Sequence, residues 1–368
     1  MFSFNKKKPS VTIEAVKSAL AGVQDPVLHK DLLALNRVKD ISVDGRKVSV
    51  NVLFTTPSQS LRRQIEMAVN ALEGVKSVAV RIELSVPPDP RLMAGMHIGV
   101  KNAIAVASGK GGVGKSTTAV NLAVALAQMG AAVGLMDGDL YGPNVPMMLG
   151  ITGQAIAMGG KMVPLTAHGV RVMSMGMLVA AGTPVIWRGP MLDQAIKQFL
   201  ADVLWGTLDY LVIDLPPGTG DVQLSLCQAI PLSGAVIVTT PQAVALADVV
   251  KGVAMFQQVE VPIFGIVENM SYFVCPDCGN RHALFGSGGG RQMAEKFGVP
   301  LLGEVPFDAA VRAGGDEGQP VVVLAPESAP ARALFGVAEA VAAQITTRNL
   351  SAPKRTGPIR TPELKFIG

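Results

Sequence analysis

The chain lacks any uninterrupted apolar run near the roughly 18 to 20 residues that a membrane-spanning helix needs, although 49% of its 368 residues are hydrophobic. Lys6, Lys7 and Lys8 are not followed by an apolar segment, which argues against a secretory signal. We therefore expect no membrane partner and a cytoplasmic location. The apolar content instead predicts a large buried core, and the length suggests two or three domains.

The body of the chain also lacks an excess of positive charge. The net charge is +4, but residues 1–10 carry +3 and residues 348–368 carry +4, which leaves −3 for the rest. Basic ends of this kind are typical of solvated, disordered segments. We expect residues 348–368 to form a disordered basic tail, and we expect no nucleic-acid partner.

Cysteine is scarce, with three in the whole chain. Cys227 lies in an apolar segment with helical spacing and is expected in the core. Cys275 and Cys278 stand three apart in Cys-Pro-Asp-Cys, so a tight turn can aim both thiolates at one metal centre. Two thiolates are half of a tetrahedral site, and no second pair exists. A second copy of the chain across a two-fold axis would complete a [4Fe-4S] or a zinc site.

Two alternatives at this segment stay open on the residues alone. His282 follows four positions after Cys278 and is either a further ligand or an ordinary exposed loop histidine. Cys275 and Cys278 could instead form a redox disulfide.

A glycine-rich segment with two lysines is the most informative motif. An apolar strand is expected at 102–107 and a helix at 116–129, and the loop joins them. Glycines let backbone N–H groups converge on phosphate oxygens at the helix N-terminus. In a phosphate-binding loop Lys115 reaches the β- and γ-phosphates and Ser116 binds Mg²⁺, which predicts a nucleoside triphosphatase. The loop residues are Gly109, Lys110, Gly111, Gly112, Val113, Gly114, Lys115, Ser116 and Thr117.

Carboxylates end two other apolar runs. Asp214 closes 210–214, where it suits the Mg²⁺ site of phosphoryl transfer, and the proline- and glycine-rich loop from Leu215 to Asp221 suits sensing of the γ-phosphate. Asp137 and Asp139 end another run, where a carboxylate holds Mg²⁺ through water or orients the attacking water. The alternative for these two is an ordinary turn at a strand end.

The periodicity divides the chain into parts. Residues 10–85 predict a small α+β domain with helices at 12–21 and 58–72, strands at 47–54 and 77–84, and a hairpin turn at Asp44-Gly45. Residues 86–99 contain three prolines and predict a linker. Residues 100–347 alternate strand and helix, which predicts an α/β domain with a mostly parallel sheet wrapped by helices and ligands at the carboxyl ends of the strands. Its strands are expected at 133–136, 170–173, 210–215, 235–239, 263–267 and 301–305.

Five motifs, in this order, resemble the Mrp/ApbC iron–sulfur cluster carrier ATPases of the MinD-like, deviant Walker A group. They are Gly-Lys-Gly-Gly-Val-Gly-Lys-Ser-Thr, Asp-Gly-Asp-Leu-Tyr-Gly-Pro-Asn, Ile-Asp-Leu-Pro-Pro-Gly-Thr-Gly-Asp, Val-Glu-Asn-Met-Ser and Cys-x-x-Cys. The resemblance covers roughly residues 10–345, and the first part is similar to MIP18-type domains. It implies an ATPase that uses ATP and Mg²⁺, shares a [4Fe-4S] cluster between two copies and hands it to apo iron–sulfur proteins under the control of ATP.

The resemblance also implies residue roles. Lys110 matches the signature lysine that reaches the partner's phosphates in a nucleotide-bridged homodimer. Asn269 matches the residue that recognises adenine, and Asp139 matches the aspartate associated with the hydrolytic water. Cys275 and Cys278 match the cluster ligands.

The first domain departs from its family, because residues after Thr56-Pro57 are Ser-Gln-Ser where many MIP18-type domains have a cysteine. A docking or regulatory role is therefore expected for this domain.

Two related ATPase classes are the alternatives. A MinD- or ParA-like positioning or partition ATPase shares the loop and its extra lysine, but it leaves Cys275 and Cys278 without a role. Prolines at 353, 358 and 362 also oppose the amphipathic helix that a membrane-binding member would use. A nitrogenase-type iron protein takes its cluster ligands singly from separated loops, unlike this pair.

Overall fold

A computed structural model describes residues 11–95, 99–139, 142–174, 177 and 202–351. The chain divides into two compact units, Met1–Pro87 and Pro88–Gly368. The boundary falls inside the segment 86–99 that was expected to be a linker. Most of the expected tail, from residue 352 onward, lies outside the described residues.

The first unit has the predicted α+β composition. Its order is α1 (Ile13–Leu20), β1 (Val38–Asp44), β2 (Lys47–Phe54), α2 (Gln59–Asn70) and β3 (Ser77–Leu84). β1 and β2 pair antiparallel around the expected Asp44-Gly45 turn, and β2 pairs parallel with β3 after the crossover through α2. Helix α2 begins where the Ser58 hydroxyl accepts a hydrogen bond from the Leu61 N–H. Both helices pack on this sheet around a separate core.

The second unit is built on a nine-stranded, mostly parallel sheet in the order β13-β12-β11-β4-β10-β5-β9-β8, with β14 also paired to β12. Among the described strands of this sheet, β8 and β13 are the antiparallel ones. The central strands are buried along their whole length, because helices cover both faces. The strands are β4 (Ala103–Ala107), β5 (Val133–Asp137), β8 (Leu165–Ala167), β9 (Val170–Ser174), β10 (Tyr210–Asp214), β11 (Gly234–Thr239), β12 (Ile263–Val274), β13 (Arg281–His282) and β14 (Leu301–Phe307).

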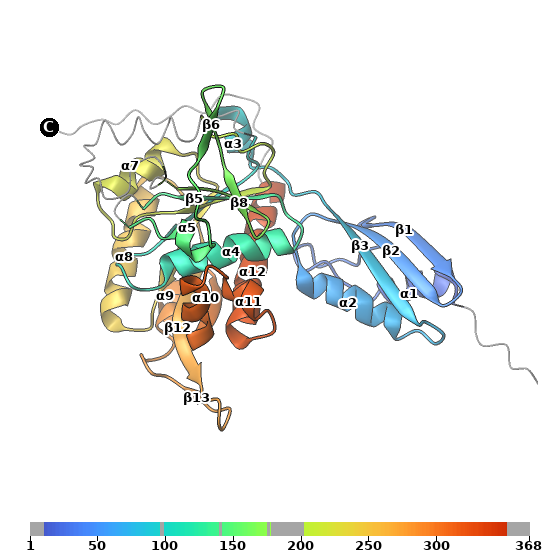
Figure 1. Ribbon diagram of the computed structural model, residues 1–368. Helices are drawn as coiled ribbons and strands as arrows, with labels where there is room; N and C mark the ends of the chain where they lie inside the picture. The colour runs from blue at the N-terminus through green and yellow to red at the C-terminus, as the bar shows by residue number, and fades with distance from the viewer. Residues whose placement is uncertain (1–10, 96–98, 140–141, 175–176, 178–201, 352–368) are drawn as a thin grey trace, which may run out of the picture. The chain divides into compact units, whose positions relative to one another are not determined.

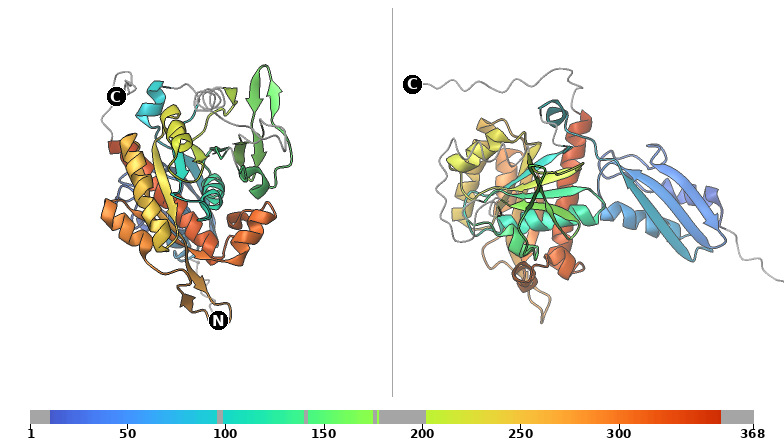
Figure 2. Two further views of the ribbon diagram at one scale, coloured as in Figure 1. Left: turned by 90° about the vertical axis from the view of Figure 1, so that its left-hand side faces the viewer. Right: turned by 45° about the horizontal axis from the view of Figure 1, so that its top comes forward.

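The helices of this unit surround the sheet, as Figures 1 and 2 show. Helices α7 and α8 share one core cluster with β10 and β11, whereas α4 packs beside α12. A separate two-stranded hairpin joins β6 (Ile156–Met158) to β7 (Lys161–Val163). The helices are α3 (Pro90–Gly95), α4 (Lys115–Gln128), α5 (Val145–Met148), α7 (Asp221–Ala229), α8 (Ala243–Gln258), α9 (Gly289–Phe297), α10 (Ala309–Asp316), α11 (Val321–Leu324) and α12 (Ala329–Ser351).

The structure differs from the sequence expectations at three boundaries. The linker segment contains helix α3, and Arg91 bonds to Asp89 and to the carbonyl oxygens of Leu232 and Ser233, which holds this segment on the second unit. Helix α12 continues past 347 to Ser351. Strand β12 extends beyond 267 to Val274, because its last residues pair with β13.

Within the described part of the chain, none of the helices is long and apolar enough to cross a bilayer.

Candidate functional site

The phosphate-binding loop joins β4 to the N-terminus of α4. Gly112 and Gly114 adopt φ angles of 81° and 84°, which glycine reaches without a Cβ penalty. The Ser108 hydroxyl donates to the Lys110 carbonyl oxygen at 2.8 Å, and the Thr118 hydroxyl donates to the Gly114 carbonyl oxygen at 2.9 Å. The first bond fixes the start of the loop, and the second fixes its end at the first turn of the helix. Backbone N–H groups and the helix dipole favour an anion at this turn.

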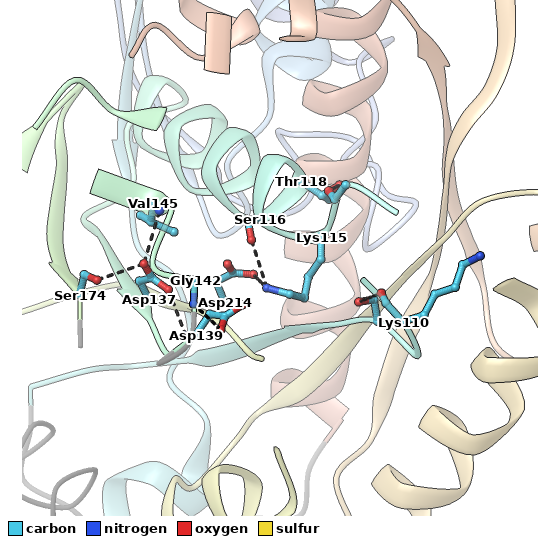
Figure 3. A network of polar contacts seen from close by, with 12 residues as sticks. Lys110, Lys115, Ser116, Thr118, Asp137, Asp139, Gly142, Val145, Ser174 and Asp214 are labelled. Atoms are coloured by element: carbon cyan, nitrogen blue, oxygen red, sulfur yellow. Dashed lines mark hydrogen bonds and ion pairs between the residues drawn. The ribbon is translucent and has the colours of Figure 1, made fainter. Parts of the chain in front are cut away.

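Lys115 and Asp214 form a buried ion pair beneath this loop (Figure 3). The Lys115 ammonium lies 2.5 Å from one carboxylate oxygen of Asp214 and 3.2 Å from the Ser116 hydroxyl. Burial raises the pKa of Asp214, and the charge and hydrogen bond of Lys115 oppose that shift. Among the described residues no group hydrogen-bonds to the second carboxylate oxygen, which is also buried. That oxygen is therefore a candidate acceptor or metal ligand.

Asp137 lies directly beside Asp214, because the two aspartates are register partners on the parallel strands β5 and β10. Its carboxylate accepts hydrogen bonds from the Ser174 hydroxyl at 3.0 Å and from the Asp139 N–H at 3.1 Å. Burial and the negative charge of Asp214 raise the pKa of Asp137 to about 7. Two buried carboxylates that disfavour each other's ionisation make a position where a bound cation is favourable.

The oxygen donors at this position suit Mg²⁺. Asp137, Asp214 and the Ser116 hydroxyl offer hard oxygen ligands, and Mg²⁺ in phosphoryl-transfer sites takes a few such ligands while water and substrate phosphates fill the rest. The unbonded oxygen of Asp214 fits this role best among the described atoms.

Asp139 borders a pocket of about 420 Å³. The Gly142 N–H donates to its carboxylate at 3.2 Å, which holds the side chain at the carboxyl end of β5. Pro216, Pro217 and Gly220 from the loop after β10 form another wall. The pocket therefore joins the segment expected to hold Mg²⁺ or orient the attacking water to the loop expected to sense the γ-phosphate. Asp221, which was expected to end this loop, is the first residue of α7.

Lys110 does not join the buried ion pair. Figure 3 shows its side chain pointing away from Lys115 and Asp214. The Lys115 side chain therefore points into the site, and the Lys110 side chain points outward.

Asn269 contacts the loop from β12. Its side-chain amide donates to the Val113 carbonyl oxygen at 2.9 Å, across 156 positions of sequence. A Cβ on Gly114 would lie 2.1 Å from the same amide nitrogen, so this glycine is required by close approach as well as by its φ. In this arrangement the amide nitrogen bonds to the loop, and the amide oxygen is the group of Asn269 that remains for a base.

Sequence reasoning missed Glu268, the neighbour of Asn269. Its carboxylate is fully buried and accepts hydrogen bonds from the Ser271 hydroxyl at 2.5 Å and from the Gly290 N–H. Glu268 thereby connects β12 to the start of α9, on either side of the cysteine turn. A charged residue inside an otherwise apolar strand was the available signal. Ser174, the partner of Asp137, carried no such signal.

The cysteine pair occupies the turn between β12 and β13, which projects from the second unit in Figure 1. The turn is closed by bonds from the Cys275 N–H to the Asn280 carbonyl oxygen and from the Gly279 N–H to the Cys275 carbonyl oxygen, both 2.9 Å. Cys275 is half-buried and Cys278 is exposed, and both are free thiols. Backbone hydrogen bonds from Cys278 and Asp277 lower the pKa of Cys275, which favours its thiolate.

The described residues contain no group of three or more His, Cys, Asp or Glu side chains that could hold a metal ion. His282 lies exposed in β13 opposite Phe273, so it does not complete a site with the two cysteines within one chain. Cys227, by contrast, is buried in the core as expected, and burial raises its pKa to about 12.

Known proteins share this organisation along most of the chain. Residues 99–342 match the family model of the NUBPL iron-transfer P-loop NTPases, and residues 13–82 match that of an iron–sulfur cluster assembly protein. A Synechocystis protein named iron–sulfur cluster carrier protein is 51% identical over 347 residues, which cover 91% of this chain and 98% of the relative. The protein of the same name from Escherichia coli K12 is 43% identical, with 92% and 94% covered.

Solved structures agree with the fold of the second unit. A nucleotide-binding protein in complex with ADP from Archaeoglobus fulgidus has a TM-score of 0.56 at 39% identity, over 65% of this chain and 92% of that one. The cell division ATPase MinD from Pyrococcus furiosus has a TM-score of 0.50 at 27% identity, over 65% and 98%. The chain belongs to the NUBPL iron-transfer P-loop NTPases and carries an iron–sulfur cluster assembly domain in its first unit.

Proposed function

We propose that this protein is an ATP-dependent iron–sulfur cluster carrier, which holds one [4Fe-4S] cluster between two copies of the chain and transfers it to apoproteins. The observation that carries the proposal is a projecting turn with two free cysteines on a P-loop NTPase domain. The names of the relatives as iron–sulfur cluster carrier proteins support the same assignment.

In the proposed nucleotide site, the loop 109–117 cradles the phosphates of ATP. Lys115 exchanges its bond to Asp214 for the β- and γ-phosphates, and Asn269 faces the adenine with its amide oxygen. Ser116, Asp137 and the unbonded oxygen of Asp214 would hold Mg²⁺, directly or through water, and the ion would neutralise charge that develops on the phosphates. The outward direction of Lys110 suits contact with the phosphates of a second copy.

Hydrolysis in this scheme depends on Asp139, which borders the pocket shared with the loop after β10. Its carboxylate is placed to accept a hydrogen bond from the attacking water. The loop at 215–221 then changes position when the γ-phosphate leaves, because that phosphate is the group it contacts.

In the proposed cluster site, Cys275 and Cys278 supply two thiolates and the same residues of a second copy supply two more. A [4Fe-4S] cluster takes four thiolate ligands, so one chain leaves the cargo half-ligated. The lowered pKa of Cys275 favours the ligating form of its thiol.

Strand β12 connects the two sites. It carries Asn269, bonded to the phosphate-binding loop, and it ends immediately before Cys275. A shift of the loop on ATP binding therefore reaches the cysteine turn through six residues of one strand. We propose that this path changes the spacing of the facing cysteine pairs and so controls how tightly the cluster is held.

The first experiment compares iron and acid-labile sulfide after anaerobic reconstitution of wild type, Cys275→Ala/Cys278→Ala and the control Cys227→Ala. We expect about four irons per two chains in wild type and in the control, and none in the double variant, because a [4Fe-4S] cluster needs four thiolates. Zinc in place of iron, or equal iron in all three proteins, would contradict the cluster assignment.

A second experiment tests whether ATP controls the release of the cluster. Lys115→Ala loaded with cluster should release it to an apoprotein without the change in rate that ATP causes in wild type. An equal effect of ATP on both proteins would disprove the coupling. ATP-dependent binding to liposomes or to nonspecific DNA would instead favour a positioning or partition ATPase.

We also propose a cytoplasmic location and a docking or regulatory role for the first unit.

A further inference from the structure

Gln223 is a buried polar residue that the proposed mechanism has not used. It lies in the first turn of α7, directly after the loop expected to sense the γ-phosphate. Its side chain is 2% exposed, and among the described residues no group hydrogen-bonds to its amide oxygen. A buried acceptor left without a partner costs about 1 to 3 kcal/mol, so its presence calls for an explanation.

The position of Gln223 supplies that explanation. Gln223 borders the same pocket of about 420 Å³ as Asp139. Pro216, Pro217 and Gly220, which follow Asp214 at the end of β10, line the same pocket. The residue that carries this unpartnered oxygen therefore lines the pocket together with Asp139 and with the loop that follows the buried ion pair.

The chemistry of an amide differs from that of a carboxylate in this pocket. Asp139 can only accept hydrogen bonds when ionised, whereas the glutamine amide both accepts and donates. A water molecule held by two acceptors has both hydrogens directed, and its lone pair then points in a fixed direction. The amide N–H₂ can donate to a phosphate oxygen at the same time. Some P-loop NTPases use a glutamine to orient the attacking water in this way.

We propose that Gln223 positions the water that hydrolyses ATP, together with Asp139. In the step the water oxygen forms a bond to the γ-phosphorus while the bond from that phosphorus to the bridging oxygen breaks. ADP leaves with the electron pair, and the proton of the water passes to the released phosphate. Gln223 exchanges no proton, because an amide does not titrate in this range, so it is a positioning residue.

The test compares Gln223→Ala and Gln223→Glu with Gln228→Ala, a control at an exposed position of the same helix. ATP hydrolysis and the affinity for ADP are measured on the full chain without cluster. We expect kcat to fall about 10²-fold in Gln223→Ala, because misplacing a reacting group by about 1 Å can cost that much, with ADP affinity within twofold of wild type. Gln228→Ala should match wild type in both.

The glutamate variant allows a measurement, the pH dependence of kcat, that would not change if Gln223 had only a structural role. Gln223→Glu replaces the amide by a titrating group, so its kcat should acquire a pH dependence in addition to that of wild type. Hydrolysis by Gln223→Ala within twofold of wild type would overturn the inference. So would a loss of kcat matched by an equal loss of ADP affinity in both variants. The inference on Gln223 depends on the NTPase activity alone. If it is overturned, the proposed cluster site is unaffected. If cluster loading fails, the inference on Gln223 is unaffected.

Discussion

At the scale of single residues, the glycines of the phosphate-binding loop are not equivalent. Gly114 combines a φ of 84° with the close approach of Asn269, whereas Gly111 has a φ outside the left-handed region and open space around it. The motif alone treats both as members of one pattern. The structure separates a position where any other side chain would be strained from one that leaves room for a ligand.

This difference predicts the effect of adding a methyl group. We expect Gly114→Ala to lower the free energy of unfolding by at least about 1 to 2 kcal/mol, because the new Cβ is strained by φ and meets the Asn269 amide. Gly111→Ala should change it by less than about 0.5 kcal/mol. Urea unfolding without nucleotide measures both. Equal destabilisation in the two variants would show that Asn269 does not restrict this position.

The three cysteines predict an order of chemical reactivity. Cys227 is buried with a pKa raised to about 12, whereas hydrogen bonds from the backbone lower the pKa of the half-buried Cys275. Because the thiolate is the reactive form, iodoacetamide should label Cys275 at a lower pH than Cys227, and Cys227 should stay unlabelled near neutral pH.

Mass spectrometry of the metal-free protein measures this order. Unfolding in urea removes the burial and should bring Cys227 to the reactivity of the other two thiols. Labelling of Cys227 in the folded protein as fast as Cys275 would contradict its place in the core.

At the scale of elements, β12 performs two tasks with adjacent residues. Asn269 donates to the phosphate-binding loop, whereas its neighbour Glu268 accepts from Ser271 and Gly290. Gly290 lies at the start of α9, after the cysteine turn. The base of that turn is therefore held by one buried carboxylate next to the nucleotide site.

A substitution at Glu268 tests this role of the strand. We expect Glu268→Ala to cost about 3 kcal/mol or more of unfolding free energy, because it leaves the buried Ser271 hydroxyl and Gly290 N–H unsatisfied. Hydrogen exchange should rise between residues 270 and 290. Glu304→Ala is the matched control on the paired strand β14, since its ion pair with Arg291 is partly exposed and contributes at most about 1 kcal/mol. A similar small loss for both would exclude Glu268 as the support of the turn.

At the scale of the whole molecule, the chain is two units with separate hydrophobic cores. The first has its own three-stranded sheet, and the second has the nine-stranded sheet with every residue proposed for catalysis and cluster binding. The family models divide in the same place, since one covers residues 13–82 and the other 99–342.

This division predicts that the units fold independently. Residues 88–368 expressed alone should bind ADP with an affinity within about threefold of the full chain and should take up iron after reconstitution. Residues 11–87 alone should show a cooperative unfolding transition, because a core of this size supports small domains. Loss of ADP binding in the shorter chain, despite a folded circular dichroism spectrum, would show that the first unit contributes to the nucleotide site.

The sequence by itself determined the local chemistry and the class of fold. The phosphate-binding loop, the strand ending in Asp214 and the cysteine turn were all predictable, because each depends on backbone conformations and side-chain spacings within a few neighbouring residues. The alternation of strands and helices likewise predicted a mostly parallel sheet.

Only the tertiary structure decided which distant residues meet. The register that places Asp137 beside Asp214, the bond from Asn269 to Val113 across 156 positions, and the attachment of Glu268 to Gly290 all follow from the packing of whole strands and helices. The same packing buries Gln223 at the pocket of Asp139. It also stabilises helix α3 inside the proline-containing segment 86–99. Local propensity carries no information on such contacts, because the free energy that selects them comes from burying apolar surface and satisfying polar groups throughout the folded unit.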